Sequence, residues 1–179
     1  INAGKTVAHL DLKFDAGRVA LESLVRGADV LLESFRPGAL AKLGLGAETL
    51  RELNPRLVHC ALSGFGQSGP YAQVAGHDIT SMALAGGLAT SGTAERPVFA
   101  HPPTADFAGA MQATIAILAA LLRRANTGQG SSIDVSLSEA VLAWQGITLT
   151  GALRAGGSAA RGHGLLNGGA ASYQIYATA

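Results

Sequence analysis

One stretch constrains the fold more than any other: a long apolar run that carries a single acidic side chain near its start. The run is TADFAGAMQATIAILAALLRR, residues 104–124, and its acidic residue is Asp106. A continuous apolar pattern of this length is typical of a helix rather than a strand. Its apolar part, residues 107–122, falls short of the ~20 residues that span a bilayer. We therefore expect a buried core helix.

Asp106 lies where this predicted helix begins. The first backbone N–H groups of a helix have no partner within it, and the helix end carries partial positive charge. A carboxylate there can do chemistry with a ligand, or it can simply cap the helix, which aspartate does well. The residues alone leave both interpretations open.

Composition limits the classes of function. Hydrophobic residues make up 48% of the 179 residues and charged residues 14%, so we expect an extensive core or interface and a folded chain. A net charge of +1 provides no broad field for nucleic acid or an acidic membrane, so we expect neither partner. Cys60 is the only cysteine, which excludes an internal disulfide and a cysteine zinc site built by this chain alone, and favours a cytoplasmic location. The chain opens with Ile1 and without a signal segment, so we expect sequence upstream.

Short apolar runs alternate with helical patterns along the chain. This order is typical of βαβ units in a parallel sheet, that is, of an α/β fold. We predict strands at residues 6–11, 29–33, 57–62 and 132–135, with a further strand starting at 173–176. We predict helices at residues 17–25, 39–45, 48–53, 79–88 (capped by Asp78) and 136–149, and irregular structure at 90–103 and 154–169.

Gly64, Gly66 and Gly69 fit the spacing of a dinucleotide-binding fingerprint. That motif works because a helix begins directly behind the glycines and receives a pyrophosphate. Here Pro70 follows, and the next predicted helix starts near Asp78. We therefore interpret the match as accidental and expect no NAD site.

Several collinear segments resemble the family III CoA-transferases, and within them most closely the racemase branch that acts on alpha-methylacyl-CoA. The matching segments are LDLK from Leu10, ADVLLESFRPGALAKLGLG from Ala28, NPRLVHCALSGFGQSGP from Asn54, AGHD from Ala75, ADFAGA from Ala105, TGQGSSIDVSLSEA from Thr127 and LLNGGAASYQIYAT from Leu165.

The resemblance implies a Rossmann-like parallel sheet with flanking helices, as part of the large domain of a fold in which two chains interlock as a homodimer. It also implies that this chain is about half of a family member. Residues 1–150 would belong to the large domain, which binds CoA and carries the catalytic groups. Residues 151–179 would be a glycine-rich linker and the start of a smaller domain.

The resemblance also implies the site. His77 matches a histidine of the racemases, where transferases usually carry a tyrosine or another residue. Asp106 matches a carboxylate that is the second base in racemases and the covalent nucleophile in transferases. Asp78 would orient the His77 imidazole or cap its own helix. Residues implied to contact CoA are Leu10, Asp11, Leu12, Lys13, Ser34, Phe35, Arg36, Lys42, Ala75 and Gly76.

Arg36 and Lys42 are the expected partners of the CoA phosphates, although an isolated basic residue is more often a solvated surface charge. No metal site is expected, and CoA enters as part of the substrate rather than as a cofactor. His59 lies in an apolar strand and is expected to be a hydrogen-bonded core histidine. His101, in the loop before Asp106, is a reserve candidate for the site.

Three hypotheses remain for the function. In a racemase, His77 and Asp106 would exchange a proton with the α-carbon, and an imidazole with an ordinary pKa of ~6.5 suits that role near neutrality. Burial would have to raise the pKa of Asp106 against the helix dipole, or the N–H groups beside it would hold the enolate oxygen instead. In a transferase, Asp106 would attack the thioester. The third hypothesis is a noncatalytic fragment.

Overall fold

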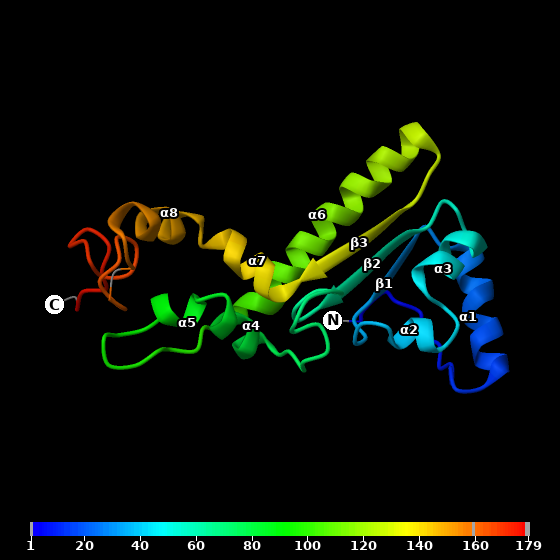
Figure 1. Cartoon of the computed structure of the whole chain (residues 1–179), viewed down its shortest axis with the longest axis horizontal. Helices are drawn as coiled ribbons and strands as arrows, with labels where there is room; N and C mark the ends of the chain where they lie inside the picture. The colour runs from blue at the N-terminus through cyan, green and yellow to red at the C-terminus, as the bar shows by residue number, and fades with distance from the viewer. Residues whose placement is uncertain (1, 159, 178–179) are drawn as a thin grey trace.

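A computed structural model describes residues 2–158 and 160–177 and contains a parallel sheet of three strands in the order β1-β2-β3 (Figure 1). The strands are β1 (Val30–Glu33), β2 (Val58–Ser63) and β3 (Ser131–Ser136). Val58 pairs with Val30 on one side and with Ser131 on the other. All three strands were predicted within two residues, and the α/β fold class is confirmed.

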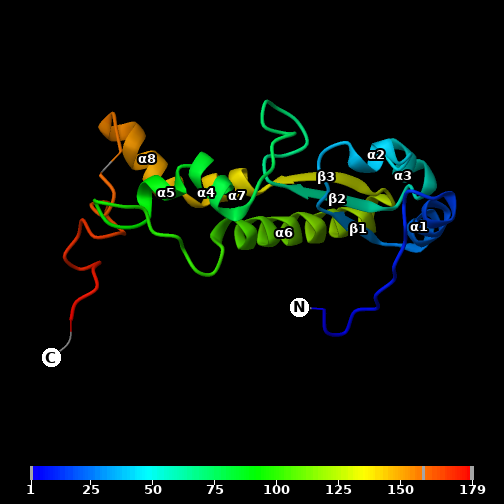
Figure 2. The ribbon, with the colours of Figure 1, turned by 90° about the horizontal axis from the view of Figure 1, so that it is seen from below.

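Helices cover both faces of this sheet, and Figure 2 shows the layers edge-on. On one face α1 (Asp15–Gly27), α2 (Ala39–Lys42) and α3 (Ala47–Leu53) surround a core of Val25, Leu40, Leu45, Leu50 and Leu57. On the other face lies α6 (Thr104–Thr127), whose Ala113 packs on Cys60 and Val135. The sheet is thus the middle of three layers.

The expectation that α6 is buried is wrong for its outer face. Small residues face the sheet and neighbouring helices: Ala105, Ala108, Gly109, Ala113 and Ala120 are the buried ones. The large side chains of Phe107, Met111, Ile115, Leu118 and Leu122 point outward and are 54–70% exposed. We call these five residues the α6 stripe. The apolar run thus has two parts: small residues that pack closely on one side of α6, and large residues that form an apolar outer face on the other.

The length argument for α6 was also wrong. Over its 24 residues the helix is long and apolar enough to cross a membrane by length and composition, a test that core helices of soluble proteins also pass. Here α6 packs lengthwise on β2 and β3 and at its start on α4 and α7.

Beyond the sheet, four shorter helices extend the molecule toward its C-terminal end (Figure 1). They are α4 (Asp78–Leu84), α5 (Gly87–Thr90), α7 (Leu137–Trp144) and α8 (Gly146–Ala155). Met82 of α4 and Val141 of α7 pack with Ala105 and Ala108 at the start of α6. This cluster fixes α4 beside the first turn of α6. The predicted domain boundary at residue 150 lies inside α8 and stays a prediction.

Four local predictions are corrected. Residues 6–11 form no strand and Val7 is 67% exposed, and residues 173–176 form none either; within residues 2–158 and 160–177 neither segment pairs with a neighbour. An apolar segment becomes a strand only when another strand edge meets it. The predicted 79–88 helix stops at Leu84 because Gly86 adopts φ 82. The predicted 136–149 helix is divided at Gln145.

Candidate active site

The candidate site lies at the edge where the parallel strands end. β1 leads into the turn at residues 34–38, and β2 leads into the long loop at 64–77. A short connection joins the end of α6 to the start of β3, so α6 runs back and begins at this same edge (Figure 1). Loops at the carboxyl ends of parallel strands are where α/β proteins usually bind ligands. The fold thus brings the predicted residues of three segments to one edge.

His77 is the last residue of the 64–77 loop, and two contacts place it: the packing of Gly76 on Gly64, and the hydrogen bonds between His77 and Thr80. Gly76 packs directly on Gly64, so that a Cβ added to Gly76 would lie 2.9 Å from the Gly64 Cα. His77 then takes the N-cap position of α4, where its N–H donates to Thr80 Oγ1 (2.8 Å) and its carbonyl accepts from the same hydroxyl (2.8 Å). The His77 side chain is exposed.

This glycine contact yields a stability prediction. Gly76→Ala in the full-length protein would force the loop away from β2, since backbone cannot yield as a flexible side chain can, and should destabilise the fold by about 1–3 kcal/mol. Gly27→Ala is the matched control, because a Cβ there meets nothing within 4 Å. Urea unfolding measures both variants. Equal midpoints for Gly76→Ala and the parent would show that the loop accommodates the methyl group.

Asp106 lies in the first turn of α6, as predicted, and its side chain is largely exposed. Partial burial is the main cause that raises the pKa of its carboxyl above the usual value. The neighbouring Asp78 carboxylate raises that pKa further, and the His77 imidazole lowers it. Asp106 therefore interacts with both other candidates, and the balance favours its neutral form more than in water.

Asp78 does neither of the two things expected of it. It is the first residue of α4 rather than its cap, and within the described residues no hydrogen bond joins it to the His77 imidazole. Its buried Oδ1 instead accepts from the backbone N–H groups of Ala105 (2.6 Å) and Asp106 (3.1 Å). Asp78 thus caps α6 from another helix. It occupies two of the N–H groups that could have held an enolate oxygen, and that hypothesis stays a prediction for the rest of the helix start.

Some residues expected to contact CoA gather around one cavity. The cavity has a volume of about 380 Å³, and Leu10, Leu12, Ser34 and Phe35 line it. The segment 10–13 folds tightly beside it: Arg18 Nη1 donates to the carbonyls of Leu12 and Lys13, and Asp11 Oδ1 accepts from Lys13 N–H.

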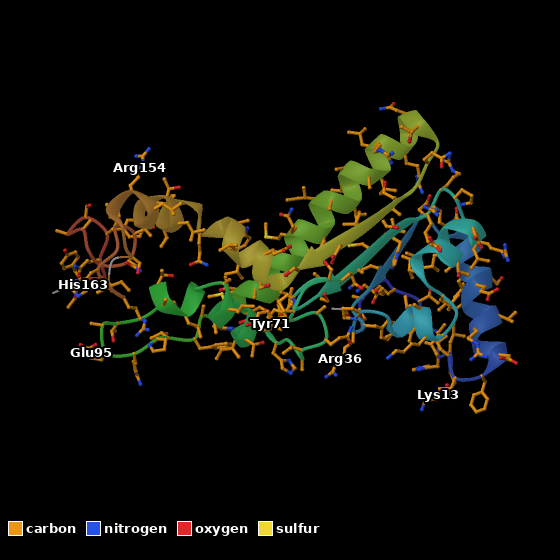
Figure 3. The ribbon with its side chains drawn as sticks, viewed as in Figure 1. Lys13, Arg36, Tyr71, Glu95, Arg154 and His163 are labelled. Carbon is orange, nitrogen blue, oxygen red and sulfur yellow. The ribbon has the colours of Figure 1, made fainter. Side chains whose placement is uncertain are left out.

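The remaining expected contacts lie outside that cavity. Lys13, Arg36 and Lys42 are exposed, and Lys13 and Arg36 point outward at the lower edge of Figure 3. Ala75 and Gly76 are on the 64–77 loop, which is tied to the 34–38 turn by a hydrogen bond from Gln73 Nε2 to the Pro37 carbonyl (3.1 Å). Sequence reasoning missed Gln73, Thr80 and Arg18. The Thr80 contact is a local one, three residues after His77, whereas the Gln73 contact joins residues 36 apart and carries no local signal.

The structure also bears on the sequence interpretations of the glycine fingerprint, His59 and His101. No helix begins directly behind the glycine fingerprint, as expected, since α4 begins only at Asp78; that no NAD site lies there stays a prediction. His59 is a core histidine, and burial lowers its pKa. The expectation that His59 is hydrogen-bonded is wrong for its Nε2. That buried atom has no hydrogen-bond partner within the described residues and lies 3.9 Å from Glu33 Oε1. His101 is exposed, and its reserve role stays a hypothesis.

A larger cavity, of about 830 Å³, lies at the other end of the molecule between residues 92–95 and 162–175. None of the predicted site residues lines it, and in Figure 3 its members Glu95 and His163 lie far from Tyr71 of the 64–77 loop. Volume alone therefore does not mark the site.

Comparison with known proteins identifies the family and agrees with the fold. The family model described as CoA-transferase family III matches residues 1–179. The chain is 40% identical to human alpha-methylacyl-CoA racemase, over all of this chain and 47% of that protein. It is also 40% identical to succinate–glutarate CoA-transferase of Agrobacterium fabrum, over 80% of this chain and 37% of that protein. A crystal structure of a CAIB/BAIF family protein from Brucella suis superposes with a TM-score of 0.85 at 34% identity, covering 88% of this chain and 42% of that one. The chain thus spans about half the length of the curated racemase it matches.

Proposed function

The chain belongs to CoA-transferase family III, and from that membership we propose that the protein containing it is an acyl-CoA racemase. It inverts the α-carbon of a 2-methylacyl-CoA by two-base proton transfer between His77 and Asp106. CoA enters as part of the substrate, and the reaction requires no metal or further cofactor. The working form is a homodimer in the cytoplasm, with no nucleic-acid or membrane partner.

The chemistry requires groups on both faces of one carbon. The thioester carbonyl makes the α-proton removable by accepting the charge as an enolate. One group removes the proton, and the other returns a proton to the opposite face. Near neutrality a neutral imidazole is a suitable base, and a carboxyl with an ordinary pKa of ~3.9 is a poor acid because it is already ionised.

The observation that carries the proposal is that Asp106 lies near His77 and has a raised pKa. The pKa of Asp106 is raised, first by burial and then by Asp78. A raised carboxyl pKa brings the proton affinity of Asp106 nearer to that of an imidazole. A racemase needs a group that can both donate and accept a proton in its two directions, and the raised pKa of Asp106 supports that role.

The second candidate is a CoA-transferase, which moves CoA between two carboxylic acids through Asp106. Asp106 attacks the thioester carbonyl and releases the CoA thiolate, and the thiolate then attacks the Asp106 carbonyl of the resulting anhydride, which frees the donor acid and leaves CoA as a thioester on Asp106. The acceptor carboxylate attacks that thioester and again releases the thiolate, which attacks the acceptor's carbonyl in the new anhydride, giving the acceptor acyl-CoA and free Asp106. Two observations favour it. The Asp106 side chain is exposed, and a transferase matches the chain at the same identity as the racemase, although over less of its length. His77 would then lie outside the covalent path.

Isotope exchange distinguishes the two. In deuterated water and without any acceptor acid, the full-length protein should introduce deuterium at the α-carbon of a 2-methylacyl-CoA, because abstraction and return use solvent-exchangeable protons. Mass spectrometry of recovered substrate measures this. Transfer of CoA to an added carboxylate, with no α-exchange, would overturn the racemase proposal.

A further inference from the structure

The first turn of α6 has no cap of its own. Pro103 occupies the N-cap position, and its side chain cannot accept a hydrogen bond. The N–H of Ala105 is out of reach of water, because Ala105 is 0% exposed. A buried N–H without an acceptor is costly, so α6 can begin here only if another segment supplies an oxygen.

We infer that Asp78 is a positioning residue, whose buried carboxylate fixes the start of α6 and holds negative charge beside Asp106. Its Oδ1 lies 2.6 Å from Ala105 N and 3.1 Å from Asp106 N. These are charge-assisted hydrogen bonds, the stronger kind. Asp78 also follows His77 directly in the chain. The backbone of the proposed base and the backbone of the proposed acid are therefore joined through one side chain.

The same carboxylate changes the electrostatics of the helix start. A helix N-terminus carries about half a positive charge, which alone would favour the ionised form of a carboxyl there. Asp78 places a negative charge against that end. Within the described residues, His77 and Asp78 are the charged groups that act on the Asp106 carboxyl, with opposite signs. Asp78 thus opposes the helix and the imidazole together, and it raises the pKa of the Asp106 carboxyl.

The catalytic consequence rests on the proposed function, but the placement and the charge effect do not. Asp78→Asn separates the capping hydrogen bonds from the charge, because the asparagine oxygen can still accept from both N–H groups while the negative charge is gone. Asp78→Ala removes oxygen and charge together. His77→Gln is the matched control of opposite sign, since it removes the neighbour that lowers the pKa of Asp106.

The experiment is a pH titration of the Asp106 carboxyl in the full-length protein, followed by NMR with ¹³C-labelled aspartate and assigned with Asp106→Asn. In Asp78→Asn the midpoint should move to lower pH, and in His77→Gln to higher pH. Urea unfolding should show a lower midpoint for Asp78→Ala than for Asp78→Asn. An unchanged Asp106 midpoint in Asp78→Asn, or equal unfolding of the two Asp78 variants, would overturn the inference.

Two further measurements keep the test decisive. Should Asp78→Asn fail to fold, Asp78→Ser provides a second neutral cap with the same expected shift. In the exchange assay, the limb on which rate falls as Asp106 loses its proton should move to lower pH in Asp78→Asn. Absence of α-exchange in the parent, with the NMR shift present, would count against the racemase and leave Asp78 as assigned. Exchange in the parent without the NMR shift in Asp78→Asn would support the racemase and overturn the role assigned to Asp78.

Discussion

Replacing His77 by alanine in the full-length protein is expected to lower α-proton exchange on a 2-methylacyl-CoA by roughly 10²–10⁴-fold, the usual scale for loss of a general acid–base group. The fold should be retained, because the imidazole is exposed and the contacts that place His77 are those of its backbone with Thr80. Mass-spectrometric exchange rates, with circular dichroism as the folding control, measure the effect.

The control for this prediction is a histidine at the other end of the molecule. His163→Ala removes an exposed imidazole beside the larger cavity and should leave exchange within a few-fold of the parent. The transferase alternative predicts a different pattern: a mild loss in His77→Ala, and an acyl group on Asp106 that hydroxylamine traps. A trapped acyl-enzyme together with a nearly unaffected His77→Ala variant would replace the racemase by the transferase.

The second large effect concerns these 179 residues expressed alone, which we expect to self-associate or precipitate and to lack racemase activity. The α6 stripe is the reason. Its five large side chains recur at helical spacing and are 54–70% exposed, and an apolar face of this kind marks an interaction surface or an aggregation site. Covering one such side chain completely stabilises an association by ~1.5–3 kcal/mol.

Charged substitutions on the stripe test this physical cause. Ile115→Lys with Leu118→Glu should shift the isolated chain toward monomer in size-exclusion chromatography with light scattering, because both positions are 60% exposed and charges there resist burial. Val19→Glu on α1 is the control, with 63% exposure outside the stripe, and should change nothing. A monomeric parent chain that binds acyl-CoA at micromolar strength would show that the stripe needs no cover and that the chain is self-sufficient.

The sequence by itself determined those features that depend on neighbours along the chain. Apolar runs separated by helical patterns were enough to predict β1, β2 and β3 and a parallel sheet, because strand and helix periodicities differ. The sequence was also enough to predict that no helix directly follows Gly69, which the structure confirms. The place of Asp106 at a helix start also followed from local pattern, and the matching segments implied His77 and the CoA-contact residues.

Only the tertiary structure decided what each group meets. Residues 6–11 are as apolar as a strand, yet they remain unpaired here because strand formation depends on a partner edge. Whether α6 is buried depended on which elements cover it, so the pattern could not place its exposed stripe. Asp78 shows the limit most clearly: its carboxylate caps a helix that begins 26 residues later, at Thr104. The raised pKa of Asp106 depends on burial and on that long-range contact, since electrostatic effects follow distance in space rather than separation along the chain.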